Sequence, residues 1–151
     1  MEPLSFEIPT TTRSYRLIHE IYVLLDAGDR QVLSAFDLTT SQYRVLSLLV
    51  ANAAYRMTDL SDILLCARST ITRLIDSLEQ AHLVQRNADG VDRRAQQVVL
   101  TPMGRERWQQ AQQAHEQSLM QRMAALSSDE QADLVQRLEQ MRDSLRIVLP
   151  I

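Results

Sequence analysis

The sequence of 151 residues contains no lysine, so all 16 of its basic residues are arginine. A P-loop needs a Lys that reaches the terminal phosphates of a nucleotide, while Schiff-base enzymes and Ser-x-x-Lys acylases need a Lys amine. Glycine is also scarce, since only Gly28, Gly90 and Gly104 occur, and they lie too far apart to form a glycine-rich nucleotide loop. These absences exclude several classes of enzyme and argue against nucleotide-dependent chemistry.

Cysteine, histidine and long apolar runs are equally sparse. The single cysteine, Cys66, excludes a disulfide within the chain and is compatible with a reducing compartment. His19, His82 and His115 do not form a metal-site spacing with it, so no metal or other cofactor is expected. No apolar run approaches the roughly 18 residues that span a bilayer, and the start MEPLSFEIP does not resemble a secretory signal. We therefore expect a cytoplasmic protein without membrane attachment.

The residues that are present, 45% hydrophobic and 23% charged, are typical of one soluble globular domain. Apolar residues recur at helical spacing through most of the chain. Thr39 and Gln42 form a capping box that begins one helix, and Ser127 with Glu130 can form another. After an extended leader, helices are predicted over about 11–36, loosened at Gly28, from 39, from about 58, over 67–80, over 102–125 and from about 128.

A change of pattern after residue 82 predicts a β-hairpin. Two short apolar runs, 83–84 and 97–100, flank the polar stretch RNADGVDRRAQ, whose Asp89-Gly90 pair favours a turn. Thr101 and Pro102 then supply an N-cap and a first helical residue, which begin the next helix. The sequence therefore predicts two strands joined by a loop rich in arginine.

The helix over 67–80 has the clearest two-sided pattern. Ile71, Leu74, Ile75 and Leu78 stand at i, i+3, i+4 and i+7, which predicts one buried face. The opposite face has no carboxylate before Asp76 and carries hydroxyl and guanidinium groups from Arg68, Ser69, Thr70, Thr72, Arg73 and Ser77. Surface helices usually mix charges of both signs. A solvated face and a face that contacts an anion both fit this pattern.

The charge distribution favours the second interpretation. The whole chain has a net charge of −3, which argues against nucleic acid as a partner. However, residues 1–55 and 108–151 each hold four Arg and six acids, whereas residues 56–107 hold eight Arg and seven acids. The basic excess is thus confined to the middle of the chain, where the two-sided helix and the hairpin lie.

Helix, helix and hairpin in this order predict a winged helix-turn-helix. The second helix must enter the major groove of DNA, which suits slender Ser69, Thr70 and Thr72, while Arg68 and Arg73 can pair with guanine edges or phosphates. The hairpin would be the wing, whose Arg93 and Arg94 can enter a minor groove. The sequence therefore predicts a reader of double-stranded DNA.

Three stretches, LTTSQYRVLSLL, MTDLSDILLCARSTITRLIDSLEQAHLVQR and DGVDRRAQQVVLTPMG, resemble the MarR (multiple antibiotic resistance regulator) family. The resemblance covers about residues 38–104 and is most specific in RSTITRLIDSLE and in the D-R-R and L-T-x-x-G parts of the wing. It implies a mainly α fold with a small β-hairpin wing and flanking dimerisation helices. The implied parts are a leader and first dimerisation helix at 1–36, the DNA-binding lobe at 37–101 and C-terminal dimerisation helices at 102–151, interleaved as one domain.

For function, the resemblance implies a homodimeric repressor that binds a pseudo-palindromic operator and is released by a small aromatic or lipophilic effector. It places the recognition helix at Ser69, Thr70, Thr72 and Arg73, with Arg94 as the groove reader of the wing and Asp92 as the residue that orients it. Two positions depart from the family pattern. Ala67 stands where a capping Ser is common, and His82 stands where a Gly usually ends the helix.

Two residue sets allow both a structural and a functional interpretation. Arg16, His19 and Tyr43 can form an effector pocket for an aromatic carboxylate, but Tyr43 also fits the buried stripe of its helix. Cys66 can be an oxidant sensor or a small core residue. A winged-helix adaptor that does not bind DNA is a further alternative, which acids on the recognition face would indicate. An enzyme is not expected, because no Ser-His-Asp, metal or nucleotide constellation is evident.

Overall fold

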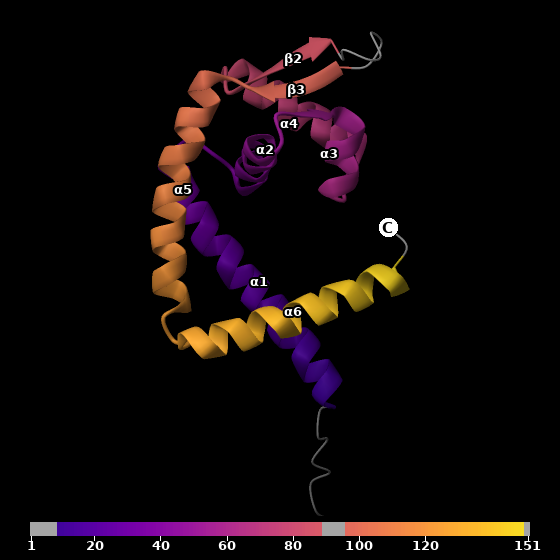
Figure 1. Cartoon of the computed structure of the whole chain (residues 1–151), viewed down its shortest axis with the longest axis vertical. Helices are drawn as coiled ribbons and strands as arrows, with labels where there is room; N and C mark the ends of the chain where they lie inside the picture. The colour runs from indigo at the N-terminus through magenta and orange to yellow at the C-terminus, as the bar shows by residue number, and fades with distance from the viewer. Residues whose placement is uncertain (1–8, 89–95, 150–151) are drawn as a thin grey trace, which may run out of the picture.

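The computed structural model describes residues 9–88 and 96–149. In these residues the fold is mainly helical with one small antiparallel sheet, as the sequence predicts (Figure 1). None of the helices among them is both long and apolar enough to cross a bilayer. The elements in chain order are α1 (Thr10–Ser34), α2 (Thr40–Ala51), β1 (Ala54–Arg56), α3 (Met57–Ile63), α4 (Arg68–Gln80), β2 (Val84–Ala88), β3 (Gln96–Leu100), α5 (Pro102–Met123) and α6 (Ser128–Val148).

The sheet has three described strands in the order β1-β3-β2, one more than the sequence predicted. The missed strand, β1, is only three residues long, and Tyr55 pairs with Val98 of the central strand. Strand β2 is also longer than the expected 83–84, because its polar residues continue the ladder as far as Ala88, which pairs with Gln96. Pairing to a neighbouring strand therefore forms β structure where the apolar pattern is weak.

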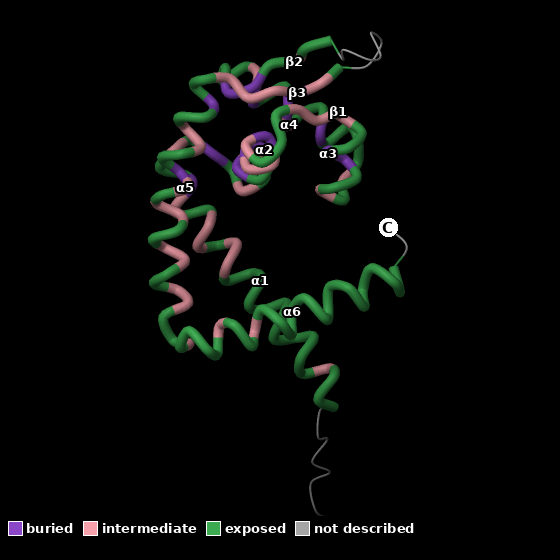
Figure 2. Tube along the Cα trace, in the orientation of Figure 1, coloured by how far each residue is buried: buried purple, intermediate pink, exposed green. Residues whose placement is uncertain are grey.

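The hydrophobic core lies in the lobe built from α2, α3, α4 and the sheet, together with the adjoining ends of α1 and α5 (Figure 2). Its fully buried side chains come from helices and strands alike. In contrast, α6 has no buried residue, and the first half of α1 is exposed apart from the partly buried Thr12 (Figure 2). The most deeply buried members of the core are Leu33, Val45, Leu46, Leu49, Leu60, Ile71, Ile75, Leu78, Val84 and Val98.

Helix α1 continues through Gly28 without a break, so the expected loosening at this glycine is wrong. The glycine instead allows close approach of another helix. A Cβ atom at this position would lie 2.6 Å from the Nη1 atom of Arg122, which comes from α5. Gly28 therefore serves helix packing and leaves the helical backbone intact.

The two departures at the ends of α4 have the expected structural effects. Ala67 precedes the helix without any side-chain hydrogen bond to cap it. After the helix, His82 adopts a left-handed backbone conformation with a φ of 58°, which is normally favourable only for glycine. The backbone N–H of Leu83 still donates to the Leu78 carbonyl at 2.9 Å, so the turn into β2 forms despite the unfavourable residue.

The start of α5 packs directly on the backbone at the start of the wing. The Thr101 hydroxyl donates to the His82 carbonyl at 2.7 Å and also accepts the Gly104 N–H at 2.9 Å. A Cβ atom on Gly104 would lie 1.9 Å from the Leu83 carbonyl oxygen, so only glycine fits here. This contact joins the lobe to the long helix that leads away from it.

The replacement Gly104→Ala is expected to lower the free energy of unfolding by about 1 to 3 kcal/mol, because the backbone that it would meet cannot rotate away. Gly28→Ala is the matched control. Its added methyl group meets the end of a flexible arginine, so a smaller loss is expected. Urea unfolding followed by circular dichroism measures both variants. Equal losses would contradict the proposed close contact at Gly104.

Candidate nucleic-acid interface

The orientation of α4 is fixed by its buried stripe. Ile71, Ile75 and Leu78 are completely buried against the rest of the lobe. Because side chains on the opposite side of a helix must then face outward, the polar face of α4 lies on the surface. All five residues of this helix that were predicted to contact DNA are exposed, namely Arg68, Ser69, Thr70, Thr72 and Arg73.

A hydrogen bond ties the start of α2 to α4. The predicted capping box of α2 is confirmed: the Gln42 side chain accepts from the Thr39 N–H at 2.8 Å, and the Thr39 hydroxyl accepts from the Gln42 N–H at 3.2 Å. The Gln42 side-chain amide also donates to the Ser77 hydroxyl at 2.9 Å. The capping role of Gln42 was predicted from the sequence, whereas its hydrogen bond to Ser77 is evident only in the structure.

A cavity adjoins each side of the exposed face of α4. One has a volume of about 390 Å³, and Arg44, Cys66 and Arg73 are among the residues that line it. The other has a volume of about 510 Å³ and lies between α3, α4 and the sheet, where Arg68, Thr72 and Arg86 line it. The exposed face of α4 is therefore flanked on both sides by hollows that arginine side chains enclose.

One arginine of this region, Arg86 of β2, was not among the residues predicted from the sequence. Its guanidinium contacts the carboxylates of both Asp76 and Glu79, which lie on α4. Although partial burial lowers the pKa of Arg86, the hydrogen bonds and charges of the two acids outweigh it and raise this pKa above its ordinary value. The spacing of these residues along the chain gave no helical or strand periodicity that would have revealed the cluster.

The predicted wing residues Asp92, Arg93 and Arg94 lie outside the described residues, as does the Asp89-Gly90 turn. The two strands that lead to them are described, with β2 ending at Ala88 and β3 beginning at Gln96. The assignments of Arg93 and Arg94 to a DNA groove and of Asp92 to wing orientation remain predictions.

Cys66 lies in the short connection between α3 and α4. It is half-buried and packs against the hydrophobic core, and its backbone carbonyl accepts a hydrogen bond of 2.7 Å from the Ser61 hydroxyl. This placement agrees with a small core residue. Cys66 also lines the cavity beside Arg73, and the oxidant-sensing hypothesis stays a prediction.

The three residues predicted to line an effector pocket do not come together within one chain. Tyr43 is buried, its hydroxyl donates to the Gln112 side chain, and its ring centroid lies 5.1 Å from that of His115. Burial raises the pKa of the Tyr43 phenol above its ordinary value, so the phenol stays neutral. In contrast, Arg16 and His19 are exposed near the start of α1, about 15 to 20 Å along the helix from Asp29, which contacts His115.

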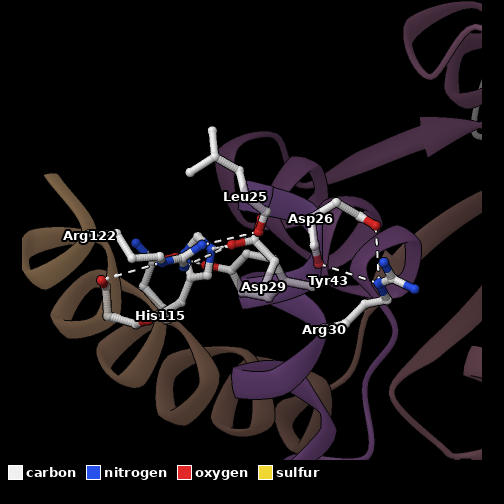
Figure 3. A network of polar contacts seen from close by, with 9 residues as sticks. Leu25, Asp26, Asp29, Arg30, Tyr43, His115 and Arg122 are labelled. Atoms are coloured by element: carbon white, nitrogen blue, oxygen red, sulfur yellow. Dashed lines mark hydrogen bonds and ion pairs between the residues drawn. The ribbon is translucent and has the colours of Figure 1, made fainter. Parts of the chain in front are cut away.

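A network of polar contacts near Tyr43 joins α1 to α5 (Figure 3). The Asp29 carboxylate accepts a hydrogen bond from Arg122 at 2.9 Å and lies 3.0 Å from a ring nitrogen of His115. Arg122 also donates to the Leu25 carbonyl at 3.1 Å. Because these side chains are mostly shielded from water, the contacts fix the position of α1 along α5 more firmly than surface ion pairs would.

The comparisons with known proteins agree with this geometry. Residues 38–95 match the model of the MarR family. The structure is similar to that of AbsC, a MarR family transcriptional regulator from Streptomyces coelicolor, with a TM-score of 0.81, 26% identity and coverage of 94% of this chain and 99% of that one. It is also similar to wild-type MarR from E. coli in its apo form, with a TM-score of 0.76, 28% identity and coverage of 89% and 97%. No curated protein matches the sequence.

Two further solved structures bear on binding. A variant of E. coli MarR complexed with operator DNA has a TM-score of 0.78 and 28% identity, with coverage of 83% of this chain and 91% of that one. Bordetella bronchiseptica BpsR, whose DNA binding is regulated by 6-hydroxynicotinic acid, has a TM-score of 0.77 and 25% identity, with coverage of 86% and 98%. Residues 38–95 thus match the model of the MarR family, and nearly the whole chain shares the winged helix-turn-helix fold of MarR family transcriptional regulators.

Proposed function

We propose that the protein is a homodimeric repressor that binds a pseudo-palindromic DNA operator and leaves it when a small aromatic or lipophilic molecule binds. The observation that carries the proposal is the exposed face of α4. From Arg68 to Arg73 this face offers hydroxyl and guanidinium groups and no carboxylate. Such side chains can donate to phosphates and base edges, and two of them are arginines that can pair with guanine.

The surroundings of α4 support DNA as the partner. The helix begins without a side-chain cap, so its first backbone N–H groups are available to a phosphate oxygen. The acidic segments at the two ends of the chain are remote from this helix in sequence, and the segment that contains it has a basic excess. A relative with the same fold has been solved with operator DNA, which supports the same use of the fold here. An adaptor that avoids DNA is less well supported, because the early part of this face lacks acids.

Two unpartnered apolar surfaces support the proposed dimer. In α6, Leu138, Met141 and Leu145 repeat at heptad spacing but are all exposed. The first half of α1 likewise exposes Tyr15, Leu17, Ile18, Ile21, Tyr22, Val23 and Leu24. Among the described residues, none of the main contacts between elements involves α6. A second copy of the chain is the occupant that would cover both surfaces, since a lone chain would leave them in water.

The proposed effector response rests on the same dimer. Since Arg16 and His19 do not meet Tyr43 within one chain, a shared pocket requires the partner subunit to bring them together. A cationic residue, an imidazole and a neutral phenol would suit an aromatic carboxylate. BpsR, a relative of the same fold, responds to 6-hydroxynicotinic acid, which supports an effector of this chemical class.

Selection of bound duplexes from random-sequence DNA tests whether the protein binds DNA sequence-specifically. The variant Arg73→Ala then tests whether the exposed face of α4 contacts the selected duplex. This variant is expected to weaken binding to the selected duplex by about 1 to 3 kcal/mol, because it removes a contact to a base edge or phosphate. Arg30→Ala, which removes an exposed arginine paired with Asp26 on α1, serves as the control and should bind like the wild type. Equal affinities of wild type and Arg73→Ala in a fluorescence titration would show that the exposed face of α4 is wrongly assigned to DNA binding.

The wing residue Arg94 gives a separate prediction. If its guanidinium neutralises a phosphate or lies in a minor groove, Arg94→Ala should weaken binding to specific and random duplexes alike. The slope of log affinity against log salt concentration should fall by about 1, because one fewer counterion is released. Titrations between about 50 and 200 mM NaCl measure this slope. An unchanged slope would remove Arg94 from the interface.

The dimer predicts the mass of the protein in solution. Sedimentation equilibrium should give about twice the 17.3 kDa of the single chain. Glutamate at both Leu138 and Leu145 should shift the equilibrium towards monomers, because charged side chains would have to be buried against the partner. Glutamate at both Gln136 and Gln140, on the other side of α6, makes the same change in charge and should leave the dimer intact. A monomeric wild type would refute the proposed assembly.

A further inference from the structure

Two acidic residues continue the exposed face of α4 beyond its acid-free part. Asp76 lies four residues after Thr72, and Glu79 follows three residues later, so all three side chains share one side of the helix. Like charges at this spacing repel each other. They would also repel the phosphates of any DNA that α4 approaches. The two carboxylates are therefore electrostatically unfavourable on the face of α4 that is proposed to bind DNA.

Arg86 of β2 offsets the negative charge of both carboxylates by contacting them. One guanidinium nitrogen contacts the Asp76 carboxylate and the other contacts the Glu79 carboxylate. The backbone N–H of Arg86 also donates to the Glu79 side chain at 3.1 Å. The Arg86 side chain is only 18% exposed, while that of Asp76 is 58% exposed. The arginine is thus held beneath the two acids and joins the first strand of the wing to α4.

This connection lies at the edge of a hollow between the helix and the sheet. The cavity of about 510 Å³ lies between the first turns of α4 and the strands, and Arg86 is one of its lining residues. Further along the helix, Ile75 and Leu78 are buried in the core together with Val84 and Val98 of the strands. Core packing therefore holds the later turns of α4 to the sheet, and Arg86 adds a polar connection beside the hollow.

We propose that Arg86 is a positioning residue for DNA binding, which pairs with Asp76 and Glu79 and thereby fixes the wing relative to the recognition helix. The proposal rests on the DNA-binding function proposed above. Arg86 neutralises the two carboxylates, and its forked guanidinium also sets the angle between β2 and α4. The recognition helix and the wing then meet DNA as one rigid unit, and specific binding depends on that geometry.

Two variants change the net charge in opposite directions, and they therefore distinguish an effect of the geometry between β2 and α4 from an effect of charge. Arg86→Gln removes one positive charge, whereas the double variant Asp76→Asn with Glu79→Gln removes two negative charges, and both remove the ion pairs between β2 and α4. Affinities are measured for the duplex selected by the wild type and for a scrambled duplex of equal length and composition. We expect both variants to reduce the ratio of the two affinities by about tenfold, because each frees the wing from α4.

A purely electrostatic role gives a different result. In that case Arg86→Gln weakens binding to both duplexes, the double variant strengthens binding to both, and the affinity ratio stays constant. That outcome would overturn the proposal. Arg86→Lys keeps the charge but lacks the fork, so its ratio should lie between those of Arg86→Gln and the wild type.

Controls separate this role from loss of folding and from failure of the function itself. Arg142→Gln removes an arginine that contacts Asp143 and Glu139 on α6, and its affinity ratio should equal that of the wild type. Thermal unfolding is recorded for every variant to show that it folds. If Arg86→Gln does not fold, the affinity ratio of the double variant alone tests the positioning role. A wild type that selects no duplex would overturn the proposed function and this inference with it. A wild type that selects a duplex, with unchanged ratios in both variants, would overturn the inference alone.

Discussion

Burial of one face of α4 is the constraint on which the other features of the lobe depend. Ile71, Ile75 and Leu78 are completely removed from water, and rotating the helix would expose them while burying arginine and hydroxyl groups. The same packing therefore decides which side chains meet solvent. The contacts of Gln42 with Ser77 and of Arg86 with the acids of α4 add polar restraints around this apolar anchor.

The sequence predicted those features that follow from local periodicity and turn chemistry. The helical stripes, the capping boxes of α2 and α6 and the strained ending of α4 at His82 are all of this kind. Strand β1 was missed because it pairs with residues distant in the chain, and the Arg86 contacts were missed because they cross the turn between α4 and β2, where no periodicity applies. Gly28 was misread because its role is to admit Arg122 from α5, which is distant in the chain. The exposed polar face of α4 was predictable because a helix buries only one side.

Buried residues are concentrated in the lobe, whereas the excess of acidic residues lies in the segments at the two ends of the chain. The lobe encloses the core, while α6 and the first half of α1 are largely exposed (Figure 2). These helices expose apolar side chains, and the segments 1–55 and 108–151 that contain them each have two more acids than arginines. Acidic residues outside the segment 56–107 lower the net charge of the chain without changing the basic excess of that segment. A total of −3 is therefore compatible with DNA binding, because phosphate contacts depend on the local charge at the interface.

Helix α5 also makes the lobe sensitive to small changes at the other end of the molecule. It is attached to the lobe by the close contact at Gly104 and to α1 by the contacts of Arg122. Its 22 residues form an arm about 33 Å long. A tilt of only about 5° at the far end would displace the lobe by about 3 Å, close to the rise of one base pair along DNA. The length of α5 would therefore convert a small tilt at one end into a displacement comparable with the spacing of base pairs.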